Sequence, residues 1–325
     1  MVGEAEDGKK AIELCLELRP DLITMDMMLP VMSGLAATEY IMAHCPTPIL
    51  IVSSSTNRGE VFETFDALAA GAVDVLEKPN GSEAAGSWEE RLVSTVKLVS
   101  RIRVITHPRG RLGSLGQPRG AGPLKLTPQK GERQCAIVAI GASTGGPAAI
   151  VEILRALPAD FSIPLLLVLH ISELFAAGFA DWLDGQLEQS VRYAADGDRL
   201  EGSAGSMILA PPNRHLVVSG GRLRLTNDPE RHSCRPSIDV LFESVAKEYA
   251  SAAAACLLTG MGRDGAAGLL AVRRASGLTI AQDEATSVVY GMPREAALLG
   301  AAERVLPLEE IGPALSALGL WRGRP

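Results

Sequence analysis

The sequence predicts an α/β protein of two domains, and three observations support this. Short apolar runs alternate with amphipathic helical stretches up to about residue 105, and the alternation resumes after about residue 133. Such alternation is typical of parallel sheets covered by helices. Between them, residues 106–133 are rich in Pro and Gly and lack apolar periodicity, which indicates a flexible linker. With 325 residues the chain is long enough for two cores, so we expect domains at 1–105 and 134–325.

The elements of the first domain follow from these patterns. Helices are expected at residues 11–18, 35–44, 60–70 and 87–104, and strands at residues 21–26, 48–53 and 74–77.

The second domain is predicted as a larger, doubly wound and mostly parallel sheet. Its strands are expected at residues 136–140, 164–169, 253–259 and 278–281, and a β-hairpin is expected from residues 205–219 and 222–226, turned by Gly220-Gly221.

Composition excludes several classes of function. The net charge of −7 and the aromatic content of 4% argue against nucleic-acid binding. The five cysteines are scattered, without a Cys-x-x-Cys pair, which fits reduced thiols in a cytoplasmic protein and neither disulfides nor a zinc site. No apolar run approaches the length of a membrane span, so we do not expect insertion into a membrane.

The most informative segment joins an apolar run at Ile137 to the turn Gly141-Ala-Ser-Thr-Gly-Gly. Pro147 then indicates the start of a helix. A serine on such a sharp strand-to-helix turn displays its hydroxyl at the end of the sheet, and the helix start offers N–H groups to an oxyanion. We therefore expect Ser143 to be a nucleophile, with the backbone N–H groups of Thr144 and Met261 as oxyanion donors.

A serine nucleophile needs a base and a group that orients the base. Among the five histidines, His170 follows a buried strand at the same sheet edge, whereas His215 and His232 fall near the hairpin, where a surface role is expected. Asp264 lies in a second glycine-rich turn after an apolar strand. Taken singly, His170 could be a strand-end histidine bonded to a carbonyl, and Asp264 could cap the helix that begins near residue 266.

Two other folds are disfavoured for this serine turn. The order Ser143, His170, Asp264 differs from the Ser, Asp, His order of α/β-hydrolases. The turn also lacks the middle glycine of the Gly-x-Gly-x-x-Gly dinucleotide motif.

In the first domain, three chemical groups follow successive strands. Asp26, Ser53 and Lys78 each come at or just after a strand end, where ligands bind in open α/β sheets. A carboxylate can accept a phosphoryl group, a hydroxyl can hydrogen-bond the phosphate, and a lysine can neutralise it. Each residue alone has a structural alternative, but their joint placement indicates a phosphoryl-accepting site.

Here the segments Asp26-Met-Met-Leu-Pro-Val-Met-Ser-Gly34, Val52-Ser-Ser54 and Glu77-Lys-Pro79 resemble the receiver domain of two-component response regulators, a flavodoxin-like fold. The resemblance implies that a histidine kinase phosphorylates Asp26 and that Ser53 and Lys78 sense the phosphate. The segment from Met1 to Gly8 resembles the second strand of a receiver and the loop after it. We therefore expect the first strand, the first helix and the acidic pair that holds Mg²⁺ in that family to be missing.

The second domain resembles the chemotaxis protein methylesterase family. The segments that carry the resemblance are Gly141-Ala-Ser-Thr-Gly-Gly-Pro, Leu169-His170, Ala210-Pro-Pro-Asn-Arg-His215, Arg235-Pro-Ser-Ile-Asp-Val-Leu-Phe242, Leu258-Thr-Gly-Met-Gly-Arg-Asp-Gly265 and Tyr290-Gly-Met-Pro-Arg-Glu-Ala296. In that family, whose sheet is Rossmann-like, the residues matching Ser143, His170 and Asp264 form a catalytic triad. Cys234 departs from the basic or His residue that is frequent in relatives.

The function implied is hydrolysis of glutamate 5-O-methyl esters on chemotaxis receptors, with deamidation of receptor glutamines and control by receiver phosphorylation. Catalysis itself needs no cofactor or metal, and Arg235 and Arg263 are candidates for contacting the acidic receptor surface. Two alternatives stay open: a non-catalytic response regulator whose second domain only binds a partner, and a nucleotide-binding domain.

Overall fold

The computed structural model describes residues 1–54, 57–79, 81, 86–102, 104, 134–200 and 205–320. The chain divides into two compact units, Met1–Leu126 and Thr127–Pro325. The linker expected at residues 106–133 lies outside the described residues, so its conformation and the exact domain boundaries stay predictions.

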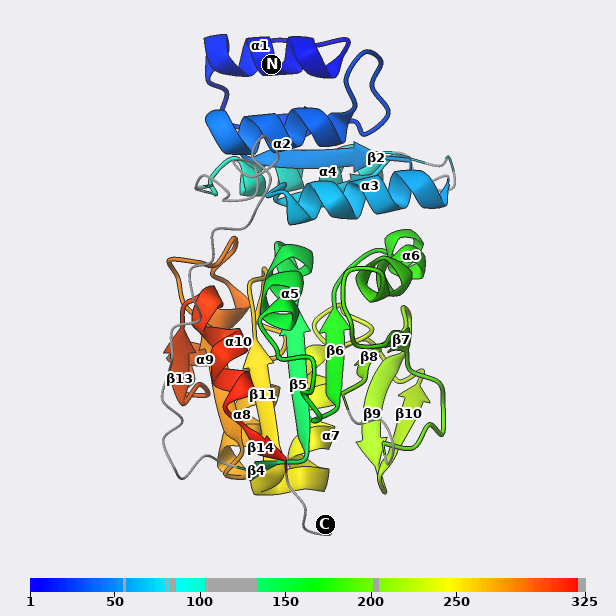
Figure 1. Cartoon of the computed structure of the whole chain (residues 1–325), viewed down its shortest axis with the longest axis vertical. Helices are drawn as coiled ribbons and strands as arrows, with labels where there is room; N and C mark the ends of the chain where they lie inside the picture. Colours follow the sequence, from blue (N-terminus) through cyan, green and yellow to red (C-terminus); the bar gives the residue numbers. More distant parts are fainter. Residues whose placement is uncertain are drawn as a thin grey trace. The chain divides into compact units, whose positions relative to one another are not determined.

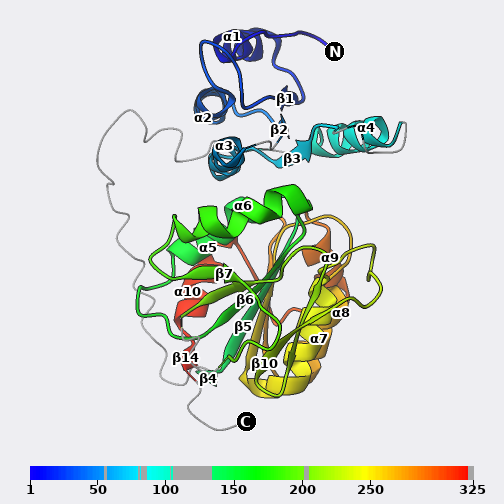
Figure 2. The same ribbon diagram turned by 90° about the vertical axis from the view of Figure 1, so that its right-hand side faces the viewer.

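The first unit contains a parallel three-stranded sheet in the order β1-β2-β3. Its strands are β1 (Ile23–Met25), β2 (Ile49–Ser53) and β3 (Asp74–Glu77), and its helices are α1 (Gly8–Leu18), α2 (Gly34–His44), α3 (Arg58–Ala69) and α4 (Ser87–Val99). Helices α2 and α3 lie on one side of the sheet and α4 on the other (Figures 1 and 2). The predicted βα alternation is therefore confirmed in this unit.

Short polar side chains fix where these helices begin. Asp7 accepts a hydrogen bond from the Lys10 N–H at 2.7 Å, and Ser33 accepts one from the Ala36 N–H at 3.3 Å. Such caps satisfy N–H groups that have no partner inside the helix.

Two expectations for the first unit are wrong. The helix expected at residues 87–104 ends at Val99, because the N–H groups of Arg101 and Ile102 bond to carbonyls three residues back and tighten the last turn. The segment from Met1 to Gly8, which resembles the second strand of a receiver and the loop after it, contains no strand. A strand needs a neighbouring strand for its hydrogen bonds, and β1 pairs with β2 alone in the described sheet.

The second unit is built on a seven-stranded sheet in the order β13-β12-β11-β5-β6-β8-β7. Its strands are β5 (Ile137–Ala142), β6 (Leu165–Leu169), β7 (Val191–Tyr193), β8 (Met207–Leu209), β11 (Ala253–Leu257), β12 (Leu278–Gln282) and β13 (Arg304–Leu306). All the pairings in this sheet are parallel. The doubly wound parallel sheet is therefore confirmed.

Helices cover both faces of this sheet, as Figure 2 shows. One face carries α5 (Gly146–Arg155), α6 (Glu173–Asp184) and α10 (Leu308–Ser316), and the other carries α7 (Ile238–Tyr249), α8 (Ala266–Arg274) and α9 (Met292–Leu298). Every residue of β5, β6, β11 and β12 is buried, which explains why β5, β6 and β11 read as continuous apolar runs, whereas β12 also buries two polar residues, Thr279 and Gln282.

The chain winds in opposite directions from β5, so that β6 lies on one side of β5 and β11 on the other. In open α/β sheets, ligands bind at the carboxyl ends of the strands where the winding direction changes. The fold therefore points to the ends of β5, β6 and β11 as the functional edge.

The hairpin exists, but its first arm is shorter than predicted. β9 (His215–Ser219) pairs with β10 (Arg222–Thr226) in an antiparallel two-stranded sheet, whereas β8 joins the main sheet beside β6. The break falls at Pro211-Pro212, which cannot donate ladder hydrogen bonds, followed by Asn213 at φ 57°.

Several elements were not predicted. The edge strands β7 and β13 have three residues each, and β4 (Gln134–Cys135) and β14 (Gly319–Leu320) form a two-residue pair, so none carries a readable period. None of the described helices combines the length and hydrophobicity needed to cross a membrane.

Candidate active site

Ser143 lies at the point where the sheet winding changes. It directly follows β5, and its backbone N–H donates to the Thr259 carbonyl at 3.0 Å, beyond the end of β11. On the other side, the His170 N–H donates to the Ala142 carbonyl at 3.0 Å, beyond the end of β6. Ser143 therefore stands between the strand ends that carry the other two predicted residues.

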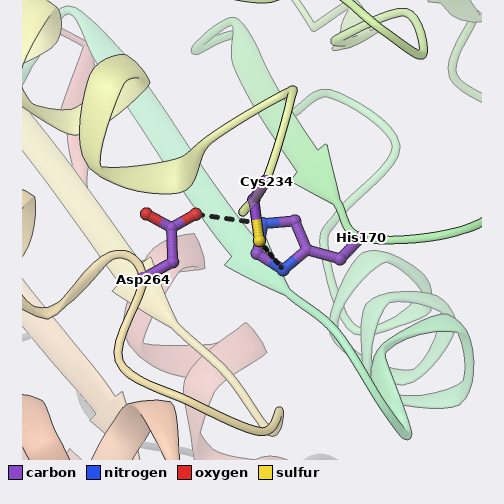
Figure 3. Close-up of side chains that lie close together, drawn as sticks. All are labelled: His170, Cys234 and Asp264. Atoms are coloured by element: carbon purple, nitrogen blue, oxygen red, sulfur yellow. Dashed lines mark hydrogen bonds and ion pairs between the residues drawn. The ribbon is translucent and has the colours of Figure 1, made fainter. Parts of the chain in front are cut away.

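His170 and Asp264 are joined by a hydrogen bond. His170 Nε2 lies 3.0 Å from Asp264 Oδ2, and the two side chains are 16% and 3% exposed (Figure 3). Because a carboxylate only accepts hydrogen bonds, this contact places a proton on Nε2. The ring nitrogen that can exchange a proton is then Nδ1.

Asp264 is held by the start of helix α7. Its Oδ1 accepts from the Ser237 hydroxyl at 2.8 Å and from the Asp239 N–H at 3.2 Å, and Oδ2 accepts from the Ile238 N–H at 2.7 Å. The alternative that Asp264 caps the helix following it is wrong, because α8 is capped by Gly265 without a side-chain hydrogen bond.

These contacts decide the charge of Asp264. Burial raises the pKa of its carboxyl, but the hydrogen bond and charge of His170, with the Ile238 N–H and the Ser237 hydroxyl, outweigh burial and lower the pKa overall. The positive end of the α7 dipole acts in the same direction. Asp264 is therefore an anion that fixes the imidazole of His170.

The imidazole of His170 is unusually basic. Burial lowers the pKa of His170, but the hydrogen bond to Asp264 and the contact with Cys234 raise it to about 9. Cys234 Sγ lies 3.8 Å from His170 Nδ1, as Figure 3 shows. A thiol thus faces the same ring nitrogen that is available for proton transfer, a neighbour whose position the sequence does not reveal.

The predicted oxyanion donors sit on the turns after β5 and β11. Thr144 is 9% exposed and its carbonyl accepts from the Thr259 hydroxyl at 2.9 Å. The side chain of Met261 is 59% exposed, and its backbone N–H makes no hydrogen bond within the described part of the chain. The two turns approach closely, because a Cβ on Gly260 would come within 2.7 Å of the Ser143 Cβ.

Two other predicted residues have intramolecular partners. Arg263 Nε lies 3.3 Å from His232 Nδ1, and an Arg235 N–H donates to the Asp228 carbonyl at 3.3 Å. The expectation that His215 lies on the surface is wrong, because this side chain is 0% exposed and its Nδ1 accepts from the Ser237 N–H at 3.1 Å.

Within the described residues, two groups of side chains are close enough together to hold a metal ion, and both include Asp264. His170, Cys234 and Asp264 form one, and His232, Asp239 and Asp264 form the other. In both, the Asp264 oxygens already accept protein hydrogen bonds, and His232 Nε2 lies 3.1 Å from Asp239 Oδ2. Hydrogen bonding within the protein therefore accounts for the closeness of the side chains in both groups.

In the first unit, the structure brings together two of the three predicted residues. Lys78 Nζ lies 2.5 Å from Asp26 Oδ2 at the sheet edge. Ser53 instead donates to Glu60 Oε1 at 2.6 Å. Glu60 is 3% exposed, and its N–H donates to Asn57 Oδ1 at 2.9 Å at the start of α3. The Asn57-x-x-Glu60 spacing indicates a helix start, but it does not predict the hydrogen bond between Glu60 and Ser53.

Mg²⁺ takes oxygen ligands in octahedral geometry. No group of three or more His, Cys, Asp or Glu side chains gathers at Asp26 among the residues that the structure describes. The carboxylate of Asp26 is already paired with Lys78. These residues alone therefore do not fit a magnesium site.

The fold and the site define a class: a two-unit α/β protein whose second unit carries the side chains of a serine hydrolase at its winding point. Comparison with known proteins makes this specific. Residues 138–315 match the family model of the CheB methylesterase, and residues 1–85 match that of the response regulator receiver domain. The chain belongs to the CheB methylesterase family.

Individual relatives agree with this assignment. The chain is 42% identical to protein-glutamate methylesterase/protein-glutamine glutaminase 2 of Anaeromyxobacter dehalogenans, covering 97% of this chain and 88% of the relative. It is 44% identical to a protein of the same name from Cupriavidus metallidurans, covering 96% and 88%.

A solved structure shows the same fold. The crystal structure of the Thermotoga maritima CheB methylesterase catalytic domain aligns with 56% of this chain and 98% of its own, at 35% identity and a TM-score of 0.53. The family and the fold expected from the motifs are thereby confirmed.

Proposed function

We propose that this protein hydrolyses glutamate 5-O-methyl esters on chemoreceptors, releasing methanol, and that it deamidates receptor glutamines. The observation that carries the proposal is the position of Ser143 between the strand ends that display the bonded pair His170 and Asp264. The names of the relatives, which pair a methylesterase with a glutaminase, support both activities.

The first half-reaction forms an acyl enzyme. Ser143 Oγ attacks the ester carbonyl while His170 Nδ1 takes the hydroxyl proton. Asp264 keeps the other proton on Nε2 and stabilises the imidazolium. The backbone N–H groups of Thr144 and Met261 hold the oxyanion, and the imidazolium then protonates the departing methoxide, which leaves as methanol.

The second half-reaction releases the product. Water gives a proton to His170 as its oxygen attacks the acyl carbon. The tetrahedral intermediate then collapses to a free glutamate side chain while His170 returns this proton to Ser143 Oγ, which regenerates the hydroxyl. An amide substrate passes through the same acyl enzyme and loses ammonia instead of methanol. One site therefore accounts for both activities.

The receiver unit supplies control of this reaction. The match to the receiver family and the pairing of Lys78 with Asp26 support phosphorylation of Asp26 by a chemotaxis histidine kinase in the cytoplasm. Receiver phosphorylation is typically Mg²⁺-dependent, but the described residues at Asp26 do not by themselves form a site for the ion. Lys78 would neutralise the phosphoryl group, and Ser53 would have to leave Glu60 to bond it.

The test is methanol release from membranes that carry methylated chemoreceptor. Ser143→Ala is expected to lower kcat by at least about a thousandfold, since loss of a triad nucleophile removes the covalent route. Ser219→Ala, at an exposed position of the hairpin, is the matched control and should keep the wild-type rate. Methanol release by Ser143→Ala at the wild-type rate would contradict Ser143 as the nucleophile, whereas no methanol release by the wild-type protein would favour the alternative of a partner-binding domain without catalysis.

A further inference from the structure

A buried polar network lies directly behind the serine turn and is not used by the proposed mechanism. Its centre is Thr259, which is 1% exposed and follows the end of β11. Its second member is Gln282, the last residue of β12, which is 0% exposed. Buried polar side chains of this kind are costly unless they are bonded, so their partners show what they hold in place.

Thr259 bonds to the serine turn through two of its atoms. Its backbone carbonyl accepts from the Ser143 N–H at 3.0 Å, and its hydroxyl donates to the Thr144 carbonyl at 2.9 Å. The hydroxyl also accepts from the Val289 N–H at 2.9 Å, on the segment that follows β12. One side chain thus connects the end of β5 to the segment between β12 and α9.

Gln282 in turn fixes Thr259. The Gln282 Oε1 accepts from the Thr259 N–H at 2.8 Å, and its Nε2 donates to the Thr286 carbonyl at 2.8 Å. The next residue along, Gly260, donates to the Val289 carbonyl at 3.0 Å. The network is therefore held both by Gln282, at the end of β12, and by the segment between β12 and α9.

The consequence for the reaction follows from peptide geometry. Peptide units are planar, so a carbonyl that is held in place also fixes the N–H on the other side of its unit. The Thr259 hydroxyl holds the Thr144 carbonyl, and the Gly146 N–H holds the Ser143 carbonyl at 2.7 Å. The first bond fixes the unit that carries the Gly145 N–H, and the second fixes the unit that carries the Thr144 N–H, the predicted oxyanion donor. The Thr259 hydroxyl therefore holds the unit next to that donor, which matters because oxyanion donors act only when they are aimed in advance.

We infer that Thr259, fixed by Gln282, is a positioning residue that aims the Ser143 turn and its N–H groups at the transition state. The inference rests on the proposed function and extends it to two residues that touch neither the substrate nor the reacting atoms. If the inference holds, loss of the Thr259 hydroxyl slows the chemical step and leaves the affinity for the substrate largely unchanged.

The test compares Thr259→Val, which keeps the shape and loses the hydroxyl, with Thr259→Ser, which keeps the hydroxyl. Thr259→Val should lower kcat for methanol release about ten- to a hundredfold with KM within about twofold, because the turn that carries the oxyanion donor is no longer held in place and stabilises the transition state less well. Thr259→Ser should return kcat to within about threefold of wild type. Rates are measured below the unfolding transition followed by circular dichroism.

Thr279→Val is the matched control. Thr279 is also fully buried and its hydroxyl accepts one hydrogen bond, from the Glu303 N–H at 2.9 Å, on β12 away from the serine turn. It should lower the melting temperature and leave kcat at the wild-type value. A Thr259→Val enzyme with kcat as high as that of Thr279→Val, or one that Thr259→Ser fails to rescue, would overturn the inference.

Gln282→Met provides a second route if Thr259→Val does not fold. It removes the acceptor of the Thr259 N–H and should lower kcat in the same direction, and in a foldable double variant the two effects should be less than additive. Wild-type kcat in Gln282→Met would count against the network. Failure of the proposed function is separate, because it would appear as methanol release by Ser143→Ala.

Discussion

At the scale of single residues, the charge state of His170 governs the activity. A general base must be neutral to accept a proton, and the raised pKa of about 9 keeps His170 largely protonated at pH 7. The active fraction therefore increases as the pH rises. We expect kcat/KM for methanol release to climb through an apparent pKa near 9, measured from pH 6 to 10. A plateau already reached at pH 7 would contradict this.

Cys234 tests the cause of that basicity. Its contact with His170 Nδ1 is one of the two that raise the pKa of the imidazole. Cys234→Ala should therefore move the pH–rate profile to lower pH, while the pair with Asp264 keeps the enzyme active. If the pH–rate profile of Cys234→Ala matched that of the wild type, Asp264 alone would account for the raised pKa of His170.

The same thiol should make the enzyme sensitive to alkylation. Cys234 is partly exposed, whereas the other four cysteines are buried. N-ethylmaleimide should inactivate the wild-type protein by placing a bulky group against His170, and Cys234→Ala should resist it. Mass spectrometry of the labelled protein would locate the adduct, and inactivation of Cys234→Ala at the wild-type rate would exclude this mechanism.

At the scale of elements, glycine sets the contact between the serine turn and the segment before α9. Gly145 has φ 77°, and a Cβ there would come within 2.5 Å of the Val288 Cβ. Gly145→Ala should destabilise the fold by about 2–4 kcal/mol, from backbone strain plus a clash in a packed region, measured by urea unfolding.

Gly197→Ala separates the two contributions. Gly197 has φ 86° with nothing within 4 Å of an added Cβ, so only the backbone strain of about 1–2 kcal/mol applies. Equal losses for the two variants would mean that the contact with Val288 carries no cost.

At the scale of the whole molecule, the two units have separate cores and separate chemical sites. Asp26→Asn should therefore keep the basal rate of methanol release and lose any stimulation by the chemotaxis kinase, because the acceptor carboxylate is gone. Labelling with radioactive phosphate from the kinase would check the acceptor. Labelling of Asp26→Asn at the wild-type level would show that another residue accepts the phosphoryl group.

The sequence was most informative where both faces of an element are buried. β5, β6 and β11 stood out as apolar runs because helices cover both sides of the sheet. Edge strands of three residues gave no such signal. The first hairpin arm was predicted too long because β8 and β9 follow each other closely, and only the tertiary pairing assigns them to different sheets.

The linear chain alone determined the α/β class and the family. It also singled out Ser143, His170 and Asp264 as candidates, because His170 follows an apolar strand directly and the other two lie in glycine-rich turns after apolar strands. Only the tertiary structure decided which groups meet. It paired Asp264 with the start of α7, set Cys234 against His170, buried His215, and placed Thr259 behind the serine turn. The physical reason is that local propensity fixes strands and turns, whereas contacts such as these, between residues 26 to 115 positions apart, depend on how the sheet is wound.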